Sequence, residues 1–580
     1  MNQAMGAAAL GAATLLIGAC GGGGGAPPPV PEPSPAPPAG PNQPPIVAQP
    51  NADQTAIELH PFSYDATQGG ATFSDPDGHQ LTYTMQMSWA QPGFSFSGTT
   101  VLATPPDAGE WVNITITATD RRSSISDTFL IEVAPNSVPT VARPNLALLV
   151  DPGQHVNHDL TQGGSTFLDP DGDRLTYEVT ATFAPSAVTV NGLHVVGALD
   201  AVGLATFEIK ASDGYGGTAV DEFRLAAVGP EPSAPTLPTV SYSYADEELT
   251  MPFEFRESRE FFGPFWDTTR KSGNAPTNAG ATLGRVLFYD KRLSITNTHS
   301  CSSCHRQSNN FAAPERLSAG VQGIPLRRNA MALANVRYNL LDEYFVDLRV
   351  KGLEKLVTMP IEERTELGNL MPLLVQKLAA TDFYPKLFEA AFGTPEITSE
   401  RIVKALGQFL RSLITFRSRF DNAYLAMDSS VTPDPALVLT AQELRGAELF
   451  LGTPVSTPLT CVACHATKLQ LMDFPQNNGL DAVLIDPGRS GAFRTPSLRN
   501  IATSAPYMHD GRFATLREVI DHYDHGIQDS PQLSSRLRLA DGSVARMKLS
   551  EADKDALEAF LHTLTDDEFL RDPKFADPFL

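Results

Sequence analysis

Two copies of a Cys-x-x-Cys-His pentapeptide hold the residues of this chain best suited to chemistry. The copies are Cys301-Ser302-Ser303-Cys304-His305 and Cys461-Val462-Ala463-Cys464-His465. Two thiols at this spacing form thioethers with the vinyl groups of a haem, and the histidine that follows becomes an axial ligand of the iron. The sequence therefore predicts two covalently bound haem c groups.

Other uses of these cysteines are a zinc site built from two Cys-x-x-Cys pairs and a redox dithiol. Neither use explains why a histidine directly follows each pair, so haem attachment is favoured. The motifs account for four of the five cysteines in the chain.

The fifth cysteine, Cys20, ends a short segment of small and apolar residues, 7–19. The segment resembles a bacterial lipoprotein signal, although residues 1–19 contain no Lys or Arg. It is too short to span a bilayer, and an ordinary disordered N-terminus is the alternative. Because haem c is attached outside the cytoplasm, we expect 1–20 to be a lipoprotein signal peptide and the protein to lie on the periplasmic side of a bacterial membrane. Gly21, in place of an aspartate, favours the outer membrane.

The composition of the chain sets limits on its partners. A length of 580 residues implies several domains, and a net charge of −23 argues against nucleic acid and anionic membrane surfaces. Contact with a membrane is therefore expected only through a lipid anchor. Residues 21–46, a glycine run followed by a proline-rich stretch, predict a linker.

An internal repeat follows the linker. The segment 67–78 recurs 94 residues later as 161–172, and both copies contain Asp-Pro-Asp-Gly. Alternating residues in 114–120 and 207–213 predict antiparallel strands. We expect two all-β sandwich modules, 47–135 and 138–228, which resemble cadherin-like and immunoglobulin-like repeats and serve as spacers or contact surfaces.

Aspartates of the repeat are candidate Ca²⁺ ligands, since carboxylate oxygens suit this ion. They are Asp75, Asp77, Asp169, Asp171 and Asp173. The favoured alternative is that Asp-Pro-Asp-Gly forms only a turn.

Helical periodicity begins after a second linker, 229–249. Apolar residues of 401–413 share one helix face, and a final helix is expected to start at Ser550 with Asp553 in its cap. We expect two all-α cytochrome c-type haem domains, an N-terminal one at 250–438 and a C-terminal one at 439–580.

Ordered motifs surround both haem sites. They are Leu283–Asp290, Arg328-Asn329, Asp347-x-Arg349, Pro360, Glu366, Arg494–Asn500, Ala505–Gly511 and Asp572–Phe579. With these motifs, residues 250–580 resemble the di-haem bacterial cytochrome c peroxidase and MauG superfamily. The resemblance implies an oxidoreductase in which the N-terminal haem activates hydrogen peroxide and the C-terminal haem relays electrons.

The resemblance assigns Glu366 as the acid–base group beside the first haem and places Pro360 in the same pocket. A surface glutamate is the alternative. Leu356 stands where the family has a glutamine, and 311–328 lacks the histidine that caps this haem in many relatives. We therefore expect an open or water-filled sixth iron position.

For the second haem, the resemblance puts Tyr523 at the position of the family's methionine ligand, as in MauG-type enzymes. His522 and His525 are alternative ligands, and Tyr523 packed on the haem edge is a further alternative.

The family also carries Ca²⁺ between the haems. Asn329 matches its side-chain ligand, while Ser504 and Pro506 match its carbonyl ligands. A helix cap is the alternative role of Asn329. One departure concerns electron transfer between the haems: Val346 replaces the tryptophan that relays electrons, and the neighbouring Phe345 is far harder to oxidise.

Three functions remain open. The first is a peroxidase that receives electrons from a small donor protein, a cytochrome c or cupredoxin. The second is a MauG-like enzyme that uses a high-valent di-haem state to oxidise a side chain of a partner protein. The third is a non-enzymatic surface electron carrier.

Overall fold

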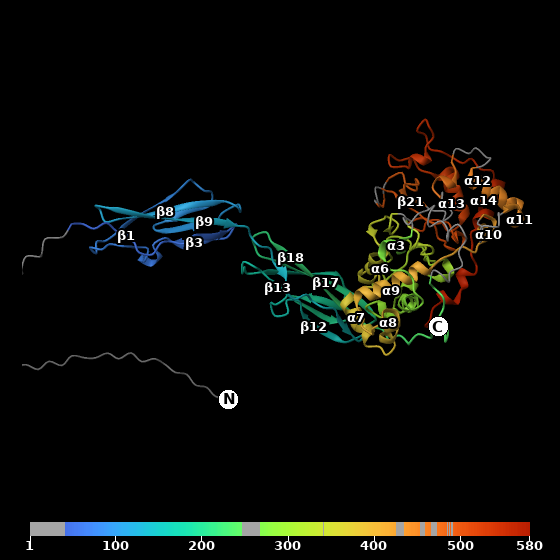
Figure 1. Cartoon of the computed structure of the whole chain (residues 1–580), viewed down its shortest axis with the longest axis horizontal. Helices are drawn as coiled ribbons and strands as arrows, with labels where there is room; N and C mark the ends of the chain where they lie inside the picture. Colours follow the sequence, from blue (N-terminus) through green and yellow to red (C-terminus); the bar gives the residue numbers. More distant parts are fainter. Residues whose placement is uncertain are drawn as a thin grey trace, which may run out of the picture. The chain divides into compact units, whose positions relative to one another are not determined.

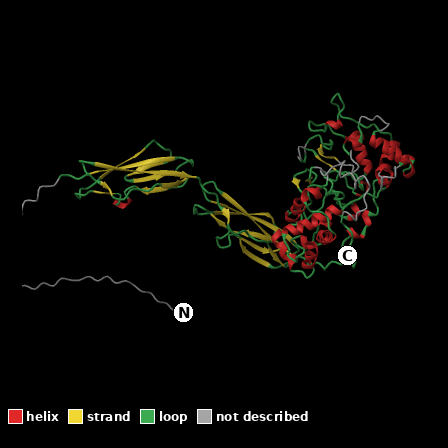
Figure 2. Cartoon of the chain, in the orientation of Figure 1, coloured by secondary structure: helices red, strands yellow, loops and turns green. Residues whose placement is uncertain are grey.

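The computed structural model describes residues 41–245, 267–339, 341–424, 434–452, 459–465, 472–483, 485–486, 488 and 491–580. The expected signal peptide 1–20, most of the linker 21–46, the end of the linker 229–249 and the first residues of the haem region lie outside them. The chain divides into two compact units, 1–136 and 137–580. Strands dominate its N-terminal part and helices its C-terminal part (Figures 1 and 2). None of the described helices has the length and apolarity needed to cross a membrane.

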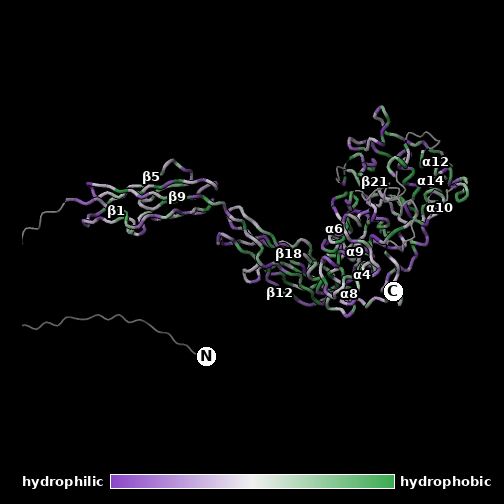
Figure 3. Tube along the Cα trace, viewed as in Figure 1, coloured by the Kyte–Doolittle hydropathy of each residue, from purple (hydrophilic) through white to green (hydrophobic). Residues whose placement is uncertain are grey.

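The first β module consists of a four-stranded and a three-stranded sheet. The larger sheet has the order β2 (Gln54–Ile57), β9 (Ser124–Ala134), β8 (Trp111–Thr119), β5 (Thr82–Met87). The smaller has the order β3 (Phe62–Asp65), β7 (Thr100–Ala103), β6 (Phe94–Ser97), and β1 (Ile46–Val47) pairs with β4 (Phe73–Ser74). Every second residue of β8 is buried, including Val112, Ile114 and Ile116, so the alternation in the sequence marks the core face. Figure 3 shows hydrophilic and hydrophobic residues interspersed along the strands of this module.

The second β module repeats this topology. Its larger sheet has the order β11 (Leu148–Val150), β18 (Thr218–Ala227), β17 (Gly203–Ser212), β14 (Thr176–Phe183). The smaller has the order β12 (His155–Asp159), β16 (His194–Ala198), β15 (Val188–Asn191), and β10 (Thr140–Val141) pairs with β13 (Phe167–Leu168). The predicted β-rich N-terminal region is confirmed.

The Asp-Pro-Asp-Gly segments form the turn that the sequence favoured. Asp75 Oδ1 accepts hydrogen bonds from the amides of Asp77 (2.9 Å) and His79 (3.1 Å), and Asp169 Oδ1 accepts them from Asp171 (2.9 Å) and Asp173 (3.3 Å). The second oxygen of Asp75 and that of Asp169 are buried without a hydrogen-bond partner. Calcium binding at these turns stays a prediction.

The haem region is helical, as expected. Its first part contains α3 (Thr268–Ser272), α4 (Asn278–Tyr289), α5 (Cys301–Cys304), α6 (Leu353–Glu362), α7 (Met371–Ala379), α8 (Tyr384–Phe392) and α9 (Ser399–Ser412), with the strand pair β19 (Glu343–Tyr344) and β20 (Val350–Lys351). Its second part contains α10 (Arg419–Tyr424), α11 (Pro435–Val438), α12 (Ala441–Leu451), η5 (Cys461–Ala463), α13 (Leu516–Asp521), η7 (His522–Gly526) and α14 (Glu551–His562), with β21 (Met472–Gln476) and β22 (Phe493–Thr495). Each part has its own hydrophobic core.

A close helix crossing at a glycine recurs in both parts. A Cβ on Gly284 of α4 would lie 2.0 Å from the carbonyl oxygen of Ala405 in α9, and one on Gly446 of α12 would lie 2.0 Å from that of Ala556 in α14. Only glycine permits such an approach of two backbones. The predicted helix 401–413 is confirmed as α9, and Ser550 caps α14 by accepting a hydrogen bond from the Asp553 amide.

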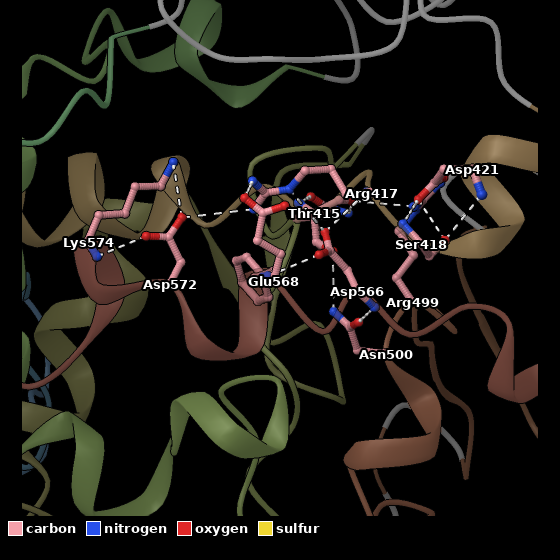
Figure 4. A network of polar contacts seen from close by, with 12 residues as sticks. Thr415, Arg417, Ser418, Asp421, Arg499, Asn500, Asp566, Glu568, Asp572 and Lys574 are labelled. Atoms are coloured by element: carbon pink, nitrogen blue, oxygen red, sulfur yellow. Dashed lines mark hydrogen bonds and ion pairs between the residues drawn. The ribbon is translucent and has the colours of Figure 1, made fainter.

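A buried polar network joins the two parts of the haem region (Figure 4). Arg499 forms an ion pair of 2.7 Å with Asp421, and their side chains are 2% and 1% exposed. Asn500 Oδ1 accepts a hydrogen bond of 2.7 Å from the Asp566 amide, and Asn500 Nδ2 donates one of 2.9 Å to Asn310 Oδ1. This network fixes the first haem motif relative to the second part.

The expected linker 229–249 does not hold the second β module away from the haem region. The Gly229 amide donates to Thr296 O (2.8 Å), and the Thr236 amide donates to Pro578 O (2.7 Å). Leu204 and Ala226 of the module also share a buried apolar cluster with Ile295 and Val321. Module and haem region therefore form one packed unit.

Candidate active site

The first Cys-x-x-Cys-His motif opens into a cavity in the N-terminal part of the haem region. Cys301, Cys304 and His305 line it together with Pro360 and Glu366. The structure thus gathers all sequence-predicted residues of the first haem site around one space.

His305 is held in the form that binds a metal. Its Nδ1 lies 2.7 Å from the carbonyl oxygen of Phe311. A carbonyl only accepts hydrogen bonds, so the contact with Phe311 favours the tautomer that has the proton on Nδ1 and the lone pair on Nε2. The backbone of Met331 makes a second hydrogen bond with the ring. Burial lowers the pKa of His305, which favours the neutral ring.

The thiols fit haem attachment better than the alternatives. Burial raises the pKa of Cys301 and of Cys461 to about 12, whereas a redox dithiol requires a lowered pKa. The four motif cysteines form no disulfide. The two pairs also line different cavities, so they do not build one four-cysteine zinc site. The residues present therefore fit two haem c groups.

Glu366 lies on the loop between α6 and α7 and is half-buried, which argues against a plain surface glutamate. No described residue forms a hydrogen bond or ion pair with its carboxylate. Burial, together with the charge of Glu363 and against the opposing charge of Arg349, raises the pKa of Glu366 to about 7. A carboxyl poised near neutrality suits acid–base work.

The backbone around Glu366 is firmly held. Its carbonyl oxygen accepts a hydrogen bond of 2.9 Å from the Val321 amide, and its own amide donates to Glu363 O (2.9 Å). A Cβ on Gly320 would lie 2.3 Å from Glu366 O, so this contact requires a glycine. The carbonyl oxygen of Pro360, near the end of α6, accepts a hydrogen bond of 3.1 Å from the Leu367 amide.

The loop 311–328, which lacks histidine, contributes Gly320, Leu326, Arg327 and Arg328 to the wall of the first cavity. Leu356, at the position of the family's glutamine, also lines this cavity. Sequence reasoning did not single out His299, which lines the same space and whose Nδ1 lies 2.7 Å from Thr298 Oγ1.

The second motif opens into a cavity in the C-terminal part. Cys461, Cys464, His465 and Tyr523 line it. Tyr523 belongs to the π-helical turn η7, and its hydroxyl accepts a hydrogen bond of 3.4 Å from Asn478 Nδ2. Burial raises the pKa of Tyr523 to about 12, so a nearby positive charge would be needed to hold it as phenolate at neutral pH.

The alternative histidines do not line this cavity. His522 Nε2 donates to Asn478 O (3.0 Å), and the side chain of His525 is 69% exposed beside Asp524. Sequence reasoning missed Met508, whose Sδ lies 3.4 Å from Asn478 Nδ2 and which lines the cavity with Tyr523. Only the fold brings this thioether next to the tyrosine.

The expected calcium ligands lie near one another. Asn329, Ser504 and Pro506 all line the second cavity, and Asn329 also lines the first. Asn329 Nδ2 donates to Glu315 O (3.0 Å) and Arg316 O (3.3 Å), and Asn329 caps no described helix. Calcium at this place stays a prediction.

Val346 lies in a wall shared by the two cavities, together with Asn329, Met331, Ala332 and Arg494. Its carbonyl oxygen accepts a hydrogen bond of 2.7 Å from the Arg494 amide. Arg328 ties the same region together by ion pairs of 2.6 Å to Asp347 and 2.6 Å to Asp486. An aliphatic side chain therefore stands between the sites where the family has a tryptophan.

Comparison with known proteins agrees with this geometry. The model of the family described as di-haem cytochrome c peroxidase matches residues 278–430. The methylamine utilization protein MauG of Methylorubrum extorquens is 32% identical over 303 residues, 50% of this chain and 79% of that protein. Cytochrome c551 peroxidase of Nitrosomonas europaea is 30% identical over 324 residues, 53% of this chain and 84% of that protein.

A crystal structure of a MauG-like protein associated with microbial copper homeostasis is 31% identical, with a TM-score of 0.45, and the match covers 53% of this chain and 95% of that one. The chain belongs to the di-haem cytochrome c peroxidase and MauG superfamily and is an oxidoreductase.

Proposed function

We propose that this protein is a di-haem c peroxidase whose N-terminal site reduces hydrogen peroxide to water. The observation that carries the proposal is a half-buried carboxyl, Glu366, in the same cavity as the Cys301–His305 motif. A non-enzymatic electron carrier has no use for such a group. A bound haem supplies the iron that binds peroxide and passes on the electrons that reduce it. The reaction consumes two electrons and two protons per peroxide and yields two waters.

Glu366 performs the proton transfers. Its carboxylate takes the proton from the peroxide oxygen nearer the iron and gives it to the farther oxygen, which leaves as water. A pKa of about 7 allows Glu366 both to accept and to release this proton near neutral pH. Apolar Leu356 and Val357 in the same wall limit competing water.

Replacing Glu366 should therefore slow peroxide reduction. Glu366→Gln keeps the shape of the side chain but removes the proton acceptor, so the second-order rate constant with peroxide should fall by about 10²–10⁴-fold. Stopped-flow absorbance measures the rate, and pyridine haemochrome spectra confirm an unchanged haem content. An unchanged rate constant would reduce Glu366 to a structural role.

The pH dependence of the peroxide reaction gives a second test of the role of Glu366. Only ionised Glu366 accepts a proton, so the wild-type rate should rise with pH through a midpoint near 7. Glu363→Gln removes the charge that raises the pKa of Glu366, and the midpoint should move to lower pH while the maximal rate is kept. Glu366→Gln should lose the pH dependence. A wild-type midpoint that Glu366→Gln does not abolish would assign the titration to another group.

A MauG-like activity is the second candidate. In this case the site stores two oxidising equivalents and uses them to oxidise a side chain of a partner protein. Tyr523 in the second cavity favours it, because an anionic phenolate lowers the potential of haem iron relative to a thioether. Val346 in the shared wall argues the other way, because it removes the usual relay.

Tyr523→Met should distinguish the axial ligands of the second haem. If Tyr523 is the ligand, the variant should raise the potential of this haem by on the order of 100 mV, a fraction of the range that axial ligands span. Spectroelectrochemistry measures the shift, and Met508→Leu is the control. A methionine–iron charge-transfer band in the wild type that Met508→Leu abolishes would exclude tyrosine ligation.

The remaining parts complete the proposal. The donor is a small cytochrome c or cupredoxin, and Ca²⁺ bound by Asn329, Ser504 and Pro506 lies between the haems. The β modules are sandwiches of the cadherin or immunoglobulin type. They present the enzyme on the periplasmic side of a bacterial membrane, most simply as an outer-membrane lipoprotein.

Intact mass spectrometry of protein extracted from membranes tests attachment. The expected mass is that of a chain starting at lipidated Cys20 plus two haems. A chain that keeps residues 1–19, or that carries fewer than two haems, would contradict this assignment.

A further inference from the structure

One arginine of the second β module holds both ends of the loop that carries Glu366. Arg224, in β18, is 9% exposed. Its Nη1 donates hydrogen bonds to Glu362 O (2.9 Å) and Asn369 O (3.0 Å), the residues on either side of the segment 363–368. Arg224 Nη1 thus binds the residues at both ends of the loop 363–368 and holds these ends together.

Charged groups extend this contact. Arg224 Nε donates to Glu222 Oε1 (2.6 Å), while the other oxygen of Glu222 accepts from Arg364 Nη1 (3.3 Å). Arg364, two residues before Glu366, also lies 3.6 Å from Glu208 of β17. Glu222 therefore links Arg224, which lies on the module, to Arg364, which lies on the loop.

Apolar packing seats the loop on the module. Gly368 has φ of 61°, and a Cβ there would lie 2.7 Å from Leu204 Cδ2 and 2.9 Å from Val321 Cγ2. Leu204 of β17 is 2% exposed in the shared cluster. Val321 also holds Glu366 directly through its amide.

We propose that the second β module is a working part of the active site and that Arg224 is a positioning residue for Glu366. The proposal rests on the proton-transfer role of Glu366 argued above. The supporting strands lie outside residues 278–430, which match the family model. The module sets where the carboxyl stands in the cavity.

The physical reason is the short range of proton transfer. A carboxyl serves peroxide only within hydrogen-bond reach, and a displacement of about 1 Å lowers a rate by about 10²-fold. Without Arg224, the carbonyls of Glu362 and Asn369 lose their shared donor and the loop gains freedom. Lysine carries the charge but not the planar fork of arginine.

The test compares Arg224→Ala, Arg224→Lys and Arg174→Ala in the full-length holoprotein. Arg174 is exposed on the same module, so its replacement controls for lost charge. We expect Arg224→Ala to slow the peroxide reaction by about 10-fold to 100-fold, Arg224→Lys to restore part of the rate, and Arg174→Ala to change nothing. Haem content and the spectrum of the second haem should stay constant.

Hydrogen–deuterium exchange supplies a readout apart from activity. Segment 362–369 should exchange faster in Arg224→Ala than in Arg174→Ala, with no change around Cys461. If Arg224→Ala does not fold with two haems, Glu222→Gln, which loosens the same contact more mildly, takes its place with the same expectations.

A double variant separates this proposal from the proposed function. Arg224→Ala should not slow Glu366→Gln further, because the group that it positions is already gone. If Glu366→Gln is slow while Arg224→Ala matches Arg174→Ala in rate and exchange, positioning by the module is wrong and the peroxidase assignment stands. If loop exchange rises but Glu366→Gln reacts normally, the proton-transfer role fails instead. Equal slowing by Arg224→Ala in both backgrounds would make its effect independent of Glu366 and overturn the proposal.

Discussion

The buried ion pair between Arg499 and Asp421, both in the second part of the haem region, anchors the segment of that part that contacts the first haem motif. Neither charge reaches solvent, so removing one partner would leave the other unpaired at a cost of about 3–5 kcal/mol. The pair also reaches the first haem motif. Asn310 donates to Arg499 O (2.9 Å) and accepts from Asn500, and the next residue, Phe311, supplies the carbonyl that fixes the tautomer of His305. One network therefore contributes both to the contact between the two parts of the haem region and to the tautomer of His305.

The distal side of the first site depends on a second constraint. The carboxyl of Glu366 has no described partner of its own, so its position comes from the backbone that carries it. The amide of Val321 and the guanidinium of Arg224 donate hydrogen bonds to that backbone, and Gly320 packs closely against it. A free carboxyl on a fixed loop suits a group that must exchange protons with substrate, since a strong permanent partner would lower its pKa and occupy its oxygens.

Sequence reasoning reached the parts of the site that depend on local spacing. Haem attachment requires two cysteines and a histidine at fixed intervals, so the spacing alone predicts haem sites at Cys301–His305 and Cys461–His465. Family motifs located Glu366 and Tyr523, which the structure brings into the cavities.

The contact of Arg224 with Asn369 spans 145 residues, and no pattern in one sequence marks it. The Pro- and Ser-rich stretch 229–238 predicted a linker, but composition does not reveal that Gly229 and Thr236 donate hydrogen bonds to the haem region. Met508 was missed because it meets Tyr523 only through Asn478.

We propose that the first haem site is open and equipped to react with peroxide without prior reduction. Stopped-flow spectroscopy of the full-length diferric protein, mixed with one equivalent of hydrogen peroxide and no reductant, tests this proposal. We predict an immediate change in the high-spin spectrum of the first haem, at a rate proportional to peroxide, because the loop 311–328 carries no histidine to occupy the iron. A diferric protein that stays unchanged and reacts only after the second haem is reduced would show that the first site is closed at rest.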